Sequence, residues 1–373
     1  MKKLGFGLMR LPLIDENDQG SIDISRFTYM VDEYLKNGFT YFDTAYPYHN
    51  GNSETAFREV VVKRYPRQAY TITNKLPMFN INDASQIPEI FDNQLEKCGV
   101  DYFDYYLLHG LDEKTYFQSE EMKAFQFVLK KKSEGKIKHI GLSFHDSADV
   151  LDKILTQHPE MEYVQLQINY IDWEDDVVQS KRCYEVAKKH NKPVIVMEPV
   201  KGGSLANISK DAEMLFKKEN EQYSIASWAI KYAASLDNVM VVLSGMSNEK
   251  QLMDNMSYMK DFQPLNEKEY EVIEKAKEII KSNIAIPCTS CHYCTENCPK
   301  QIAIPEYFSI YNNYKRFGES QYKMGVYNYE KLNDKFGKAS DCIECKQCEE
   351  HCPQHLTITN YLKEVAKVLE VKE

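Results

Sequence analysis

The chain has 373 residues, of which 43% are hydrophobic and 27% charged, a composition ordinary for a folded protein with room for one large and one small domain. The net charge of −10 argues against nucleic-acid binding, because phosphate recognition needs a basic face. No apolar run approaches the ~18 residues of a membrane span. The apolar start is broken by Arg10 and Pro12, so it does not predict a signal peptide. We expect a cytoplasmic protein with no membrane or nucleic-acid partner.

From Lys3 to about Ser247, short β-rich runs alternate with longer amphipathic stretches such as 25–38, closed by Gly38, and 224–235. The β-rich runs are 4–9, 39–44, 69–75, 103–109, 138–144, 163–169, 193–198 and 239–245. Strands separated by helices pair in parallel, because each crossover needs a dozen or more residues. Eight such units predict a (β/α)8 TIM barrel. A doubly wound sheet is the alternative, but the G-x-G-x-x-G turn usual in that fold is missing.

Four polar residues stand at or just beyond the ends of consecutive strands, where a barrel carries its chemistry. They are Asp43, Tyr48, Lys75 and His109. Each alone could be structural, for example a helix cap or a core histidine. Together they suit proton delivery to a carbonyl, because the Lys75 ammonium would lower the pKa of the Tyr48 phenol. Asp43 would balance the lysine charge, and His109 would orient the substrate oxygen.

The segments DTAYPYHNGNSE (43–54), TITNK (71–75) and DYYLLHG (104–110) resemble signature segments of the aldo/keto reductases, and the resemblance extends over about residues 3–260. That family is a TIM barrel that binds a nicotinamide cofactor without a Rossmann fold. The resemblance therefore implies a carbonyl or alcohol substrate, NADP or NAD as cofactor, and Tyr48 as the proton donor. Asp43, Lys75 and His109 would support it.

The same resemblance implies nine cofactor contacts. They are Ser143 and Gln165 at the nicotinamide carboxamide, Gly202, Gly203 and Ser204 at the pyrophosphate, and Met246, Ser247, Gln251 and Asn255 at the adenosine end. Two residues differ from the usual family pattern. Phe144 stands where an asparagine usually follows the serine at 143, and Met197 stands where a tyrosine usually stacks on the nicotinamide. Lys250 could meet a 2′-phosphate, which would favour NADP, or be an ordinary solvated lysine.

Eight of the ten cysteines form two groups with one spacing. The pattern C-x2-C-x2-C-x3-C-P begins at Cys288 and returns 54 residues later at Cys342. The following segments, CPKQIAIPEYF (298–308) and CPQHLTITNYL (352–362), also match, so this part of the chain is an internal duplication. Cys98 and Cys183 stand alone and are expected to be structural.

Three sites compete for these cysteines. CTSCH (288–292) fits attachment of a c-type haem, but it leaves Cys294 and Cys298 unexplained, and Lys346 replaces His292 in the second copy. Structural zinc generally uses two well-separated C-x-x-C pairs. The spacing predicts two [4Fe–4S] clusters, in which the fourth cysteine of each run ligates the other cluster. One cluster would take Cys288, Cys291, Cys294 and Cys352, and the other Cys342, Cys345, Cys348 and Cys298.

The tail resembles ferredoxin-type domains, and the stretches 306–318 and 326–337 predict that it is mainly α-helical. We expect a barrel over 1–264, a helical connector over 265–283 and the two-cluster domain over 284–373. Hydride transfer moves two electrons, whereas each cluster takes one. A flavin at the barrel rim could therefore pass electrons between the nicotinamide and the clusters. An electron-transfer protein could be a partner. Two alternatives remain: an electron carrier whose barrel is a regulatory docking module, and clusters that are purely structural.

Overall fold

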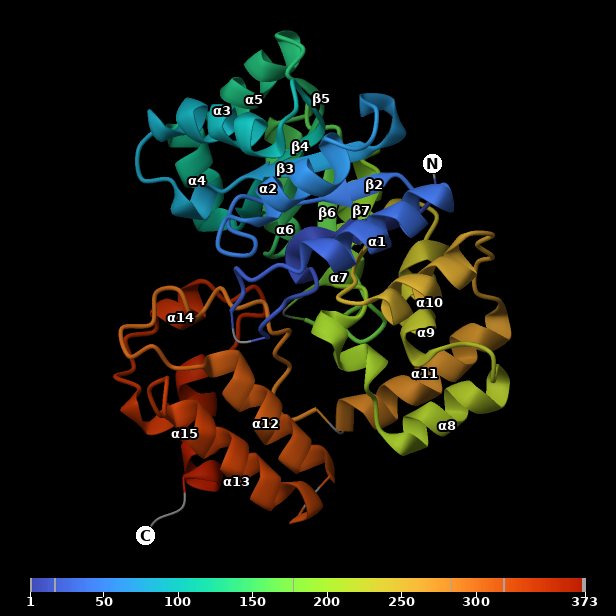
Figure 1. Cartoon of the computed structure of the whole chain (residues 1–373), viewed down its shortest axis with the longest axis vertical. Helices are drawn as coiled ribbons and strands as arrows, with labels where there is room; N and C mark the ends of the chain where they lie inside the picture. The colour runs from blue at the N-terminus through green and yellow to red at the C-terminus, as the bar shows by residue number, and fades with distance from the viewer. Residues whose placement is uncertain (1, 17, 177, 283, 318, 371–373) are drawn as a thin grey trace. The chain divides into compact units, whose positions relative to one another are not determined.

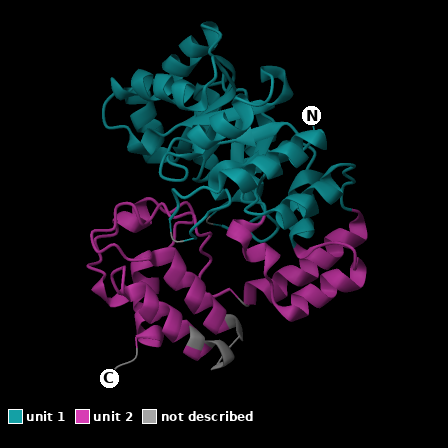
Figure 2. Cartoon of the chain, in the orientation of Figure 1, with its two compact units in different colours: residues 1–199, 226–265 teal, residues 200–225, 266–373 magenta. Residues whose placement is uncertain are grey.

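The computed structural model describes residues 2–370 except 17, 177, 283 and 318. It divides into two compact units (Figure 2). Unit 1 comprises Met1–Pro199 and Ala226–Leu265, and unit 2 comprises Val200–Ile225 and Asn266–Glu373. The segment Val200–Ile225, which lies between two barrel strands in the sequence, therefore groups with the cysteine-rich end of the chain.

Unit 1 contains eight parallel strands that pair in sequence order and close into a barrel, which confirms the predicted fold. The strands are β1 (Leu4–Gly7), β2 (Tyr41–Asp43), β3 (Thr71–Leu76), β4 (Phe103–Leu111), β5 (Ile137–Phe144), β6 (Tyr163–Gln167), β7 (Val194–Met197) and β8 (Val239–Gly245). Its helices surround them (Figure 1): α1 (Ile24–Lys36), α2 (Ser53–Phe57), α3 (Gln86–Cys98), α4 (Glu113–Glu121), α5 (Ala124–Ser133), α6 (Ala148–Gln157), α7 (Ser180–Lys189), α9 (Ile225–Ser235) and α10 (Glu249–Met259).

Alternation along the strands decides which side chains face the barrel interior. A hydrophobic cluster joins side chains from five strands, namely Tyr41, Leu107, Tyr163, Ile195, Val241 and Leu243. Gly5 leaves room for them, since a Cβ there would lie 2.8 Å from the Val241 side chain. Side chains two positions apart share a face. Asp43 follows Tyr41 by two positions and Gln165 follows Tyr163 by two. Both therefore point inward, one layer nearer the strand ends.

Unit 2 is helical. Its helices are α8 (Lys210–Glu219), α11 (Glu267–Ser282), α12 (Ile304–Phe317), α13 (Glu319–Asn333), α14 (Gln347–Glu350) and α15 (Ile358–Leu369), with a short 3-10 turn, η5 (Lys201–Ala206). The expected connector helix and the expected helix over 306–318 correspond to α11 and α12, although their last predicted residues, Asn283 and Gly318, lie outside the described residues. The expected helix over 326–337 instead spans Glu319–Asn333.

The duplication is visible in the backbone. Helices α12 and α15 begin 54 residues apart. Six residues with positive φ also form three pairs at that offset: Ser290 and Glu344, His292 and Lys346, Gln301 and His355. Equivalent positions fill the core of the unit, namely Ile302, Ile304 and Phe308 from the first copy and Leu356, Ile358 and Leu362 from the second. The two cysteine runs therefore share one local fold.

Across the described part of the chain, none of the helices combines the length and apolar character that crossing a membrane requires.

Candidate functional site

A tight loop after β2 carries Tyr48 to the end of the barrel. Backbone hydrogen bonds from Tyr48 N to Ala45 O and from Gly51 N to Tyr48 O form its turns. His49 and Asn50 have φ of 54° and 55°, and φ of Gly51 is 80°. Three consecutive left-handed residues are uncommon, and such strain gathers where function requires a fixed geometry. The loop leaves Tyr48 only 9% exposed.

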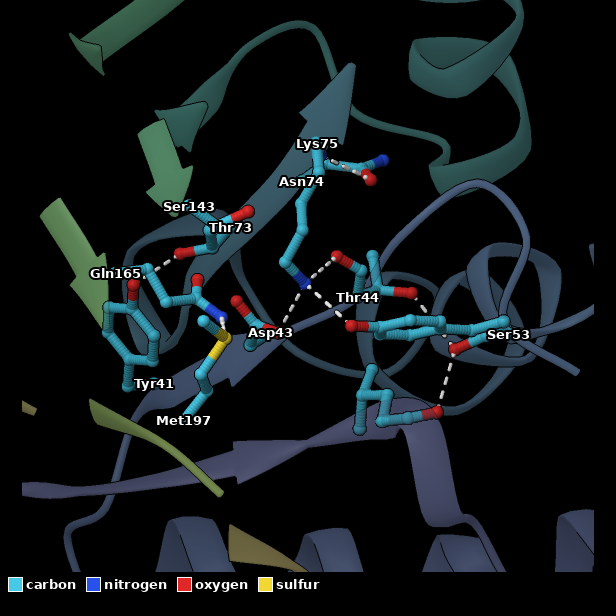
Figure 3. Close-up of polar contacts among 12 residues, drawn as sticks. Tyr41, Asp43, Thr44, Ser53, Thr73, Asn74, Lys75, Ser143, Gln165 and Met197 are labelled. Carbon is cyan, nitrogen blue, oxygen red and sulfur yellow. Dashed lines mark hydrogen bonds and ion pairs between the residues drawn. The ribbon is translucent and has the colours of Figure 1, made fainter. Parts of the chain in front are cut away.

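Lys75, at the end of β3, is the hub of the site. Its ammonium donates three hydrogen bonds, to Asp43 Oδ1 at 2.5 Å, to the carbonyl oxygen of Thr44 at 2.8 Å and to the Tyr48 hydroxyl at 3.2 Å. Figure 3 shows the bonds that radiate from this one nitrogen. An ammonium has three N–H groups, so all its donors are used. The geometry is that of a protonated lysine held in one position, with the phenol oxygen as an acceptor.

Burial governs the electrostatics of this cluster. Lys75 is 0% exposed, and burial lowers its pKa, while the carboxylate of Asp43 opposes that change. Burial also raises the pKa of Asp43, opposed by Lys75. Asp43 Oδ2 is buried and has no hydrogen-bond partner among the described residues. The ion pair is thus buried away from water, and charges attract each other more strongly in such surroundings than in water.

His109 lies beside Tyr48, with ring centroids 6.2 Å apart and an interplanar angle of 83°. Burial lowers the pKa of His109 well below its usual range, and the Lys75 charge and His145 lower it further. The imidazole is therefore neutral at physiological pH. Its Nδ1 is buried without a hydrogen-bond partner within the described residues, which leaves a polar atom available to a bound molecule.

A buried polar network fixes the backbone of Lys75, and sequence reasoning missed it. Asn74 Oδ1 accepts from Lys75 N at 2.8 Å, and Gln94 Nε2 donates to Lys75 O at 2.9 Å. Glu54 Oε1 accepts from Asn74 Nδ2 at 2.8 Å, and Tyr106 OH donates to Gln94 Oε1 at 2.6 Å. Glu54 closes the segment 43–54 that carries the family resemblance, but nothing in that segment reveals its partners.

Ser143 and Gln165 are register partners on β5 and β6, so the structure brings together the two residues expected at the nicotinamide carboxamide. Ser143 Oγ accepts from Gly110 N at 2.7 Å. Gln165 Nε2 lies 3.7 Å from the sulfur of Met197, as Figure 3 shows. Gln165 Oε1 is buried and has no hydrogen-bond partner among the described residues, so it could accept from an amide of a ligand.

The residues expected at the adenosine end follow β8, and internal contacts hold each of them. Met246 is fully buried. Ser247 N donates to Gln251 Oε1 at 2.7 Å, which ties these two residues together. Asn255 donates to Ser244 Oγ at 2.7 Å and accepts from Tyr258 OH at 2.6 Å. These contacts connect the segment after β8 to α10.

The expected pyrophosphate residues follow β7 and belong to unit 2. φ is 65° at Gly202 and 97° at Gly203. Ser204 Oγ donates to the carbonyl oxygen of Lys201 at 2.6 Å. A Cβ on Gly202 would lie 2.1 Å from the carbonyl oxygen of Thr289, whereas one on Gly203 would meet nothing within 4 Å. Gly202 therefore packs against the first cysteine run, whereas a Cβ on Gly203 would enter open space.

The eight clustered cysteines all belong to unit 2. Backbone amides point at two of their sulfurs, from Ser290 N to Cys288 Sγ at 3.4 Å and from Ile302 N to Cys298 Sγ at 3.5 Å. Hydrogen bonds of this kind stabilise thiolates that ligate iron–sulfur clusters. Apolar residues pack around six of the eight cysteines, of which Cys294 and Cys348 are buried, whereas Cys345 is exposed.

Mutual effects on pKa indicate which thiols are neighbours. Burial raises the pKa of Cys294, and the thiols that raise it further are Cys291, Cys288, Cys352 and, least, Cys348. Burial raises the pKa of Cys348 to about 12, with further contributions from Cys342, Glu349, Cys298 and Cys345. Each set joins three cysteines of one run to the fourth of the other. The two sets match the two ligand groups expected from the spacing.

Within the described residues, no three His, Cys, Asp or Glu side chains converge on a single point as ligands of one ion do. The division of the cysteines into two sets of four therefore depends on which thiols affect the pKa of one another. The two unclustered cysteines are buried in unit 1, and burial raises the pKa of both Cys98 and Cys183. A thiol with a raised pKa is unreactive.

Two family models match the chain. The model described as the aldo/keto reductase family matches residues 3–278, and the model described as the 4Fe-4S dicluster domain matches residues 287–357. The first match covers nearly the whole barrel and α11, and the second contains both cysteine runs.

Several known reductases are similar to the barrel part of the chain. An NADH-specific methylglyoxal reductase from Escherichia coli is 22% identical over 264 residues, which cover 59% of this chain and 78% of that protein. A 9,11-endoperoxide prostaglandin H2 reductase from Trypanosoma cruzi is 24% identical over 252 residues, covering 65% and 80%. Among solved structures, an aldo-keto reductase from Bacillus halodurans in its holo form has a TM-score of 0.59 at 23% identity, covering 74% and 91%. One from Klebsiella pneumoniae in complex with NADPH has a TM-score of 0.56 at 18% identity, covering 73% and 90%. These structures support the barrel fold.

Proposed function

Since the chain belongs to the aldo/keto reductase family of oxidoreductases and carries a 4Fe-4S dicluster domain, we propose that it interconverts a carbonyl compound and an alcohol with a nicotinamide cofactor. Tyr48 is the proton donor in this proposal. The observation that carries it is the Lys75 ammonium, which bonds Asp43, Thr44 and Tyr48 at once. The NADPH-bound structural neighbour and the NADH-specific relative support a nicotinamide cofactor, either NADP or NAD.

The residues divide the proton chemistry between them. Lys75 donates to the phenol oxygen, and in this proposal Tyr48 in turn donates its hydroxyl hydrogen to the substrate oxygen. After the proton leaves, the same ammonium stabilises the phenolate, and Asp43 keeps the lysine protonated. Neutral His109 offers a hydrogen bond to the substrate oxygen without adding charge. The nicotinamide supplies the hydride; Ser143 and Gln165 would hold its carboxamide.

The test is Tyr48→Phe in the complete protein. Loss of the hydroxyl should reduce carbonyl turnover with NADPH or NADH by about 10²–10⁴-fold, the usual contribution of a positioned acid. The visible absorbance of the clusters should not change. Turnover equal to that of the unaltered protein would refute the role of Tyr48.

We also propose two [4Fe–4S] clusters with crossed ligation. One takes Cys288, Cys291, Cys294 and Cys352, and the other Cys342, Cys345, Cys348 and Cys298. The neighbour relations of the thiols support this assignment. Anaerobically purified protein should be brown and contain about eight irons per chain. A colourless protein that contains zinc would contradict it.

A second function is favoured by the uneven exposure of the two cysteine runs. Thr289 is 2% exposed, but its counterpart Ile343 is 58% exposed, and Cys345, two residues further on, is exposed as well. An exposed cluster suits exchange of single electrons with a partner protein. The barrel would then bind nicotinamide as a docking module. Tight NADP(H) binding without turnover of any carbonyl would favour this function over the first.

A further inference from the structure

A buried lysine of unit 2 lies beside the residues that follow the second cysteine run. Lys201, in the turn after β7, is 3% exposed, and its ammonium donates to Gln354 Oε1 at 3.2 Å. Gln354 is buried as well and lies two residues beyond Cys352. Taking an ammonium out of water costs free energy, which hydrogen bonds and nearby negative charge offset. A negative charge in this part of unit 2 would therefore stabilise Lys201.

The backbone holds Lys201 in a conformation that few residues adopt. Its φ is 46°, in the left-handed region that disfavours side chains other than glycine. Gly203 N and Leu205 N donate to Val200 O at 3.0 and 3.1 Å, which closes the turn around Lys201. Ser204 Oγ donates to the carbonyl oxygen of Lys201 at 2.6 Å. Such strain persists only where surrounding contacts enforce it, and it gathers at functional sites.

The next residue of the turn packs against the first cysteine run. A Cβ on Gly202 would lie 2.1 Å from the carbonyl oxygen of Thr289, which stands between Cys288 and Cys291. In the crossed ligation proposed above, these two cysteines share one cluster with Cys352. Two consecutive residues of the turn therefore contact two ligand-bearing segments of the same cluster, one from each run.

The charges of the lysine and of a ligated cluster are complementary. Four thiolate ligands make a [4Fe–4S] cluster an anion as a whole, and net charge is one of the factors that set its reduction potential. We propose that the Lys201 ammonium raises the reduction potential of the cluster that contains Cys288 and Cys352. The lysine acts through space and is not a ligand. The inference rests on the crossed ligation proposed above.

The sign of the effect follows from Coulomb attraction. Reduction adds one negative charge to the cluster, so a nearby cation stabilises the reduced form more than the oxidised form. Because Lys201 is buried, water and dissolved ions screen this attraction only weakly. Loss of the lysine charge should therefore lower the midpoint potential of this cluster, and the shift should persist at high salt.

The duplication supplies a matched comparison. Lys300 stands 54 residues before Gln354 and two residues beyond Cys298, and it is exposed. Cys298 is assigned to the other cluster. Each cluster thus has a lysine near the end of the run that supplies its fourth ligand, but Lys201 is buried, whereas the charge of Lys300 is screened by solvent. Lys201 should therefore affect its cluster strongly and Lys300 should affect the other cluster weakly.

The experiment uses the complete protein, purified anaerobically and free of nicotinamide, and follows both midpoint potentials by electron paramagnetic resonance during redox titration. Lys201→Gln removes the charge and keeps a hydrogen-bond donor. At the midpoint of the unaltered protein, we expect it to lower the ratio of reduced to oxidised Cys288 cluster at least about fivefold. A tenfold change corresponds to about 59 mV for a one-electron couple. Cys298→Ala identifies the signal of the other cluster, whose potential Lys201→Gln should leave unchanged.

Three further variants separate charge from shape. Lys201→Met should lower the potential as Lys201→Gln does, whereas Lys201→Arg keeps the charge and should restore it. Lys300→Gln should shift the other cluster less, and its shift should vanish at high salt.

Iron content, about eight irons per chain, shows that the clusters of each variant are intact. Intact clusters with an unchanged potential in Lys201→Gln or Lys201→Met would overturn the inference. So would an equal shift in Lys201→Arg, because shape rather than charge would then be the cause. Either result would leave the cluster assignment and the carbonyl chemistry standing, since iron content and turnover test those separately.

Discussion

Gly202 and Gly203 provide a matched pair for measuring how tightly the β7 loop packs on the first cysteine run. Both have positive φ, so alanine at either costs about 1–2 kcal/mol in backbone strain. They differ in what the new methyl group would meet. At Gly202 it would lie 2.1 Å from Thr289 O and 2.6 Å from its carbonyl carbon, and at Gly203 it would meet nothing within 4 Å.

Because ordinary contact begins near 3.4 Å, Gly202→Ala must displace the Thr289 backbone by about 1 Å. Overpacking of this kind costs about 1–3 kcal/mol, which corresponds to about 5–150-fold in a local opening equilibrium. We therefore expect Gly202→Ala to release iron to a chelator about 5–150-fold faster than Gly203→Ala.

Two signals separate the units in this assay. Both tryptophans, Trp173 and Trp228, belong to unit 1, so their fluorescence reports the barrel, whereas visible absorbance reports the clusters of unit 2. The fluorescence transition in denaturant should be the same for both variants. Equal rates of iron release from the two variants would refute the packing argument.

The remaining predictions concern single side chains. Lys75→Met should reduce carbonyl turnover by about 10²–10⁴-fold and destabilise the barrel by about 3–5 kcal/mol, because it leaves a buried carboxylate unpaired; a barrel of unchanged stability would contradict this. Glu54→Gln should cost about 1–3 kcal/mol by disturbing the buried network, measured by tryptophan fluorescence in denaturant, with turnover lowered less than by Lys75→Met. Since the folded-state pKa of His109 lies well below 6.5, the unfolded chain binds the extra proton first, and barrel stability should fall as pH drops below about 6.5; His109→Asn should show a shallower fall. Cys298→Ala should alter the resonance signal of the cluster built from Cys342 onward and spare the other.

Much of the fold was predictable because local pattern and tertiary structure agree. The strand predicted at 239–245 has the same bounds as β8. The strand predicted at 39–44 is shorter in the structure, where β2 spans Tyr41–Asp43. Strand ends of a parallel barrel lie on one rim, which is why the approach of Asp43 to Lys75 followed from the sequence. The ligation of the cysteines and the roles of the site residues stay predictions.

Other features had no local signal. The carbonyl of Thr44 receives a bond from Lys75 only because of the loop conformation. The network through Glu54, Asn74 and Gln94 joins β3 to two helices, and no periodicity encodes such partners. The helix expected at 326–337 begins instead at Glu319, since boundaries depend on tertiary packing that propensity does not describe.

The grouping of Val200–Ile225 with the cysteine-rich unit has a consequence for any attempt to separate the two halves. The chain crosses from one unit to the other at 199–200, at 225–226 and at 265–266, so no single cut divides them. A protein truncated at residue 264 would keep Gly202 and Lys201 but lose Thr289 and Gln354, against which they pack. The cysteine-rich tail is therefore not an independent domain. Moving it to another barrel would also require moving the segment between β7 and α9.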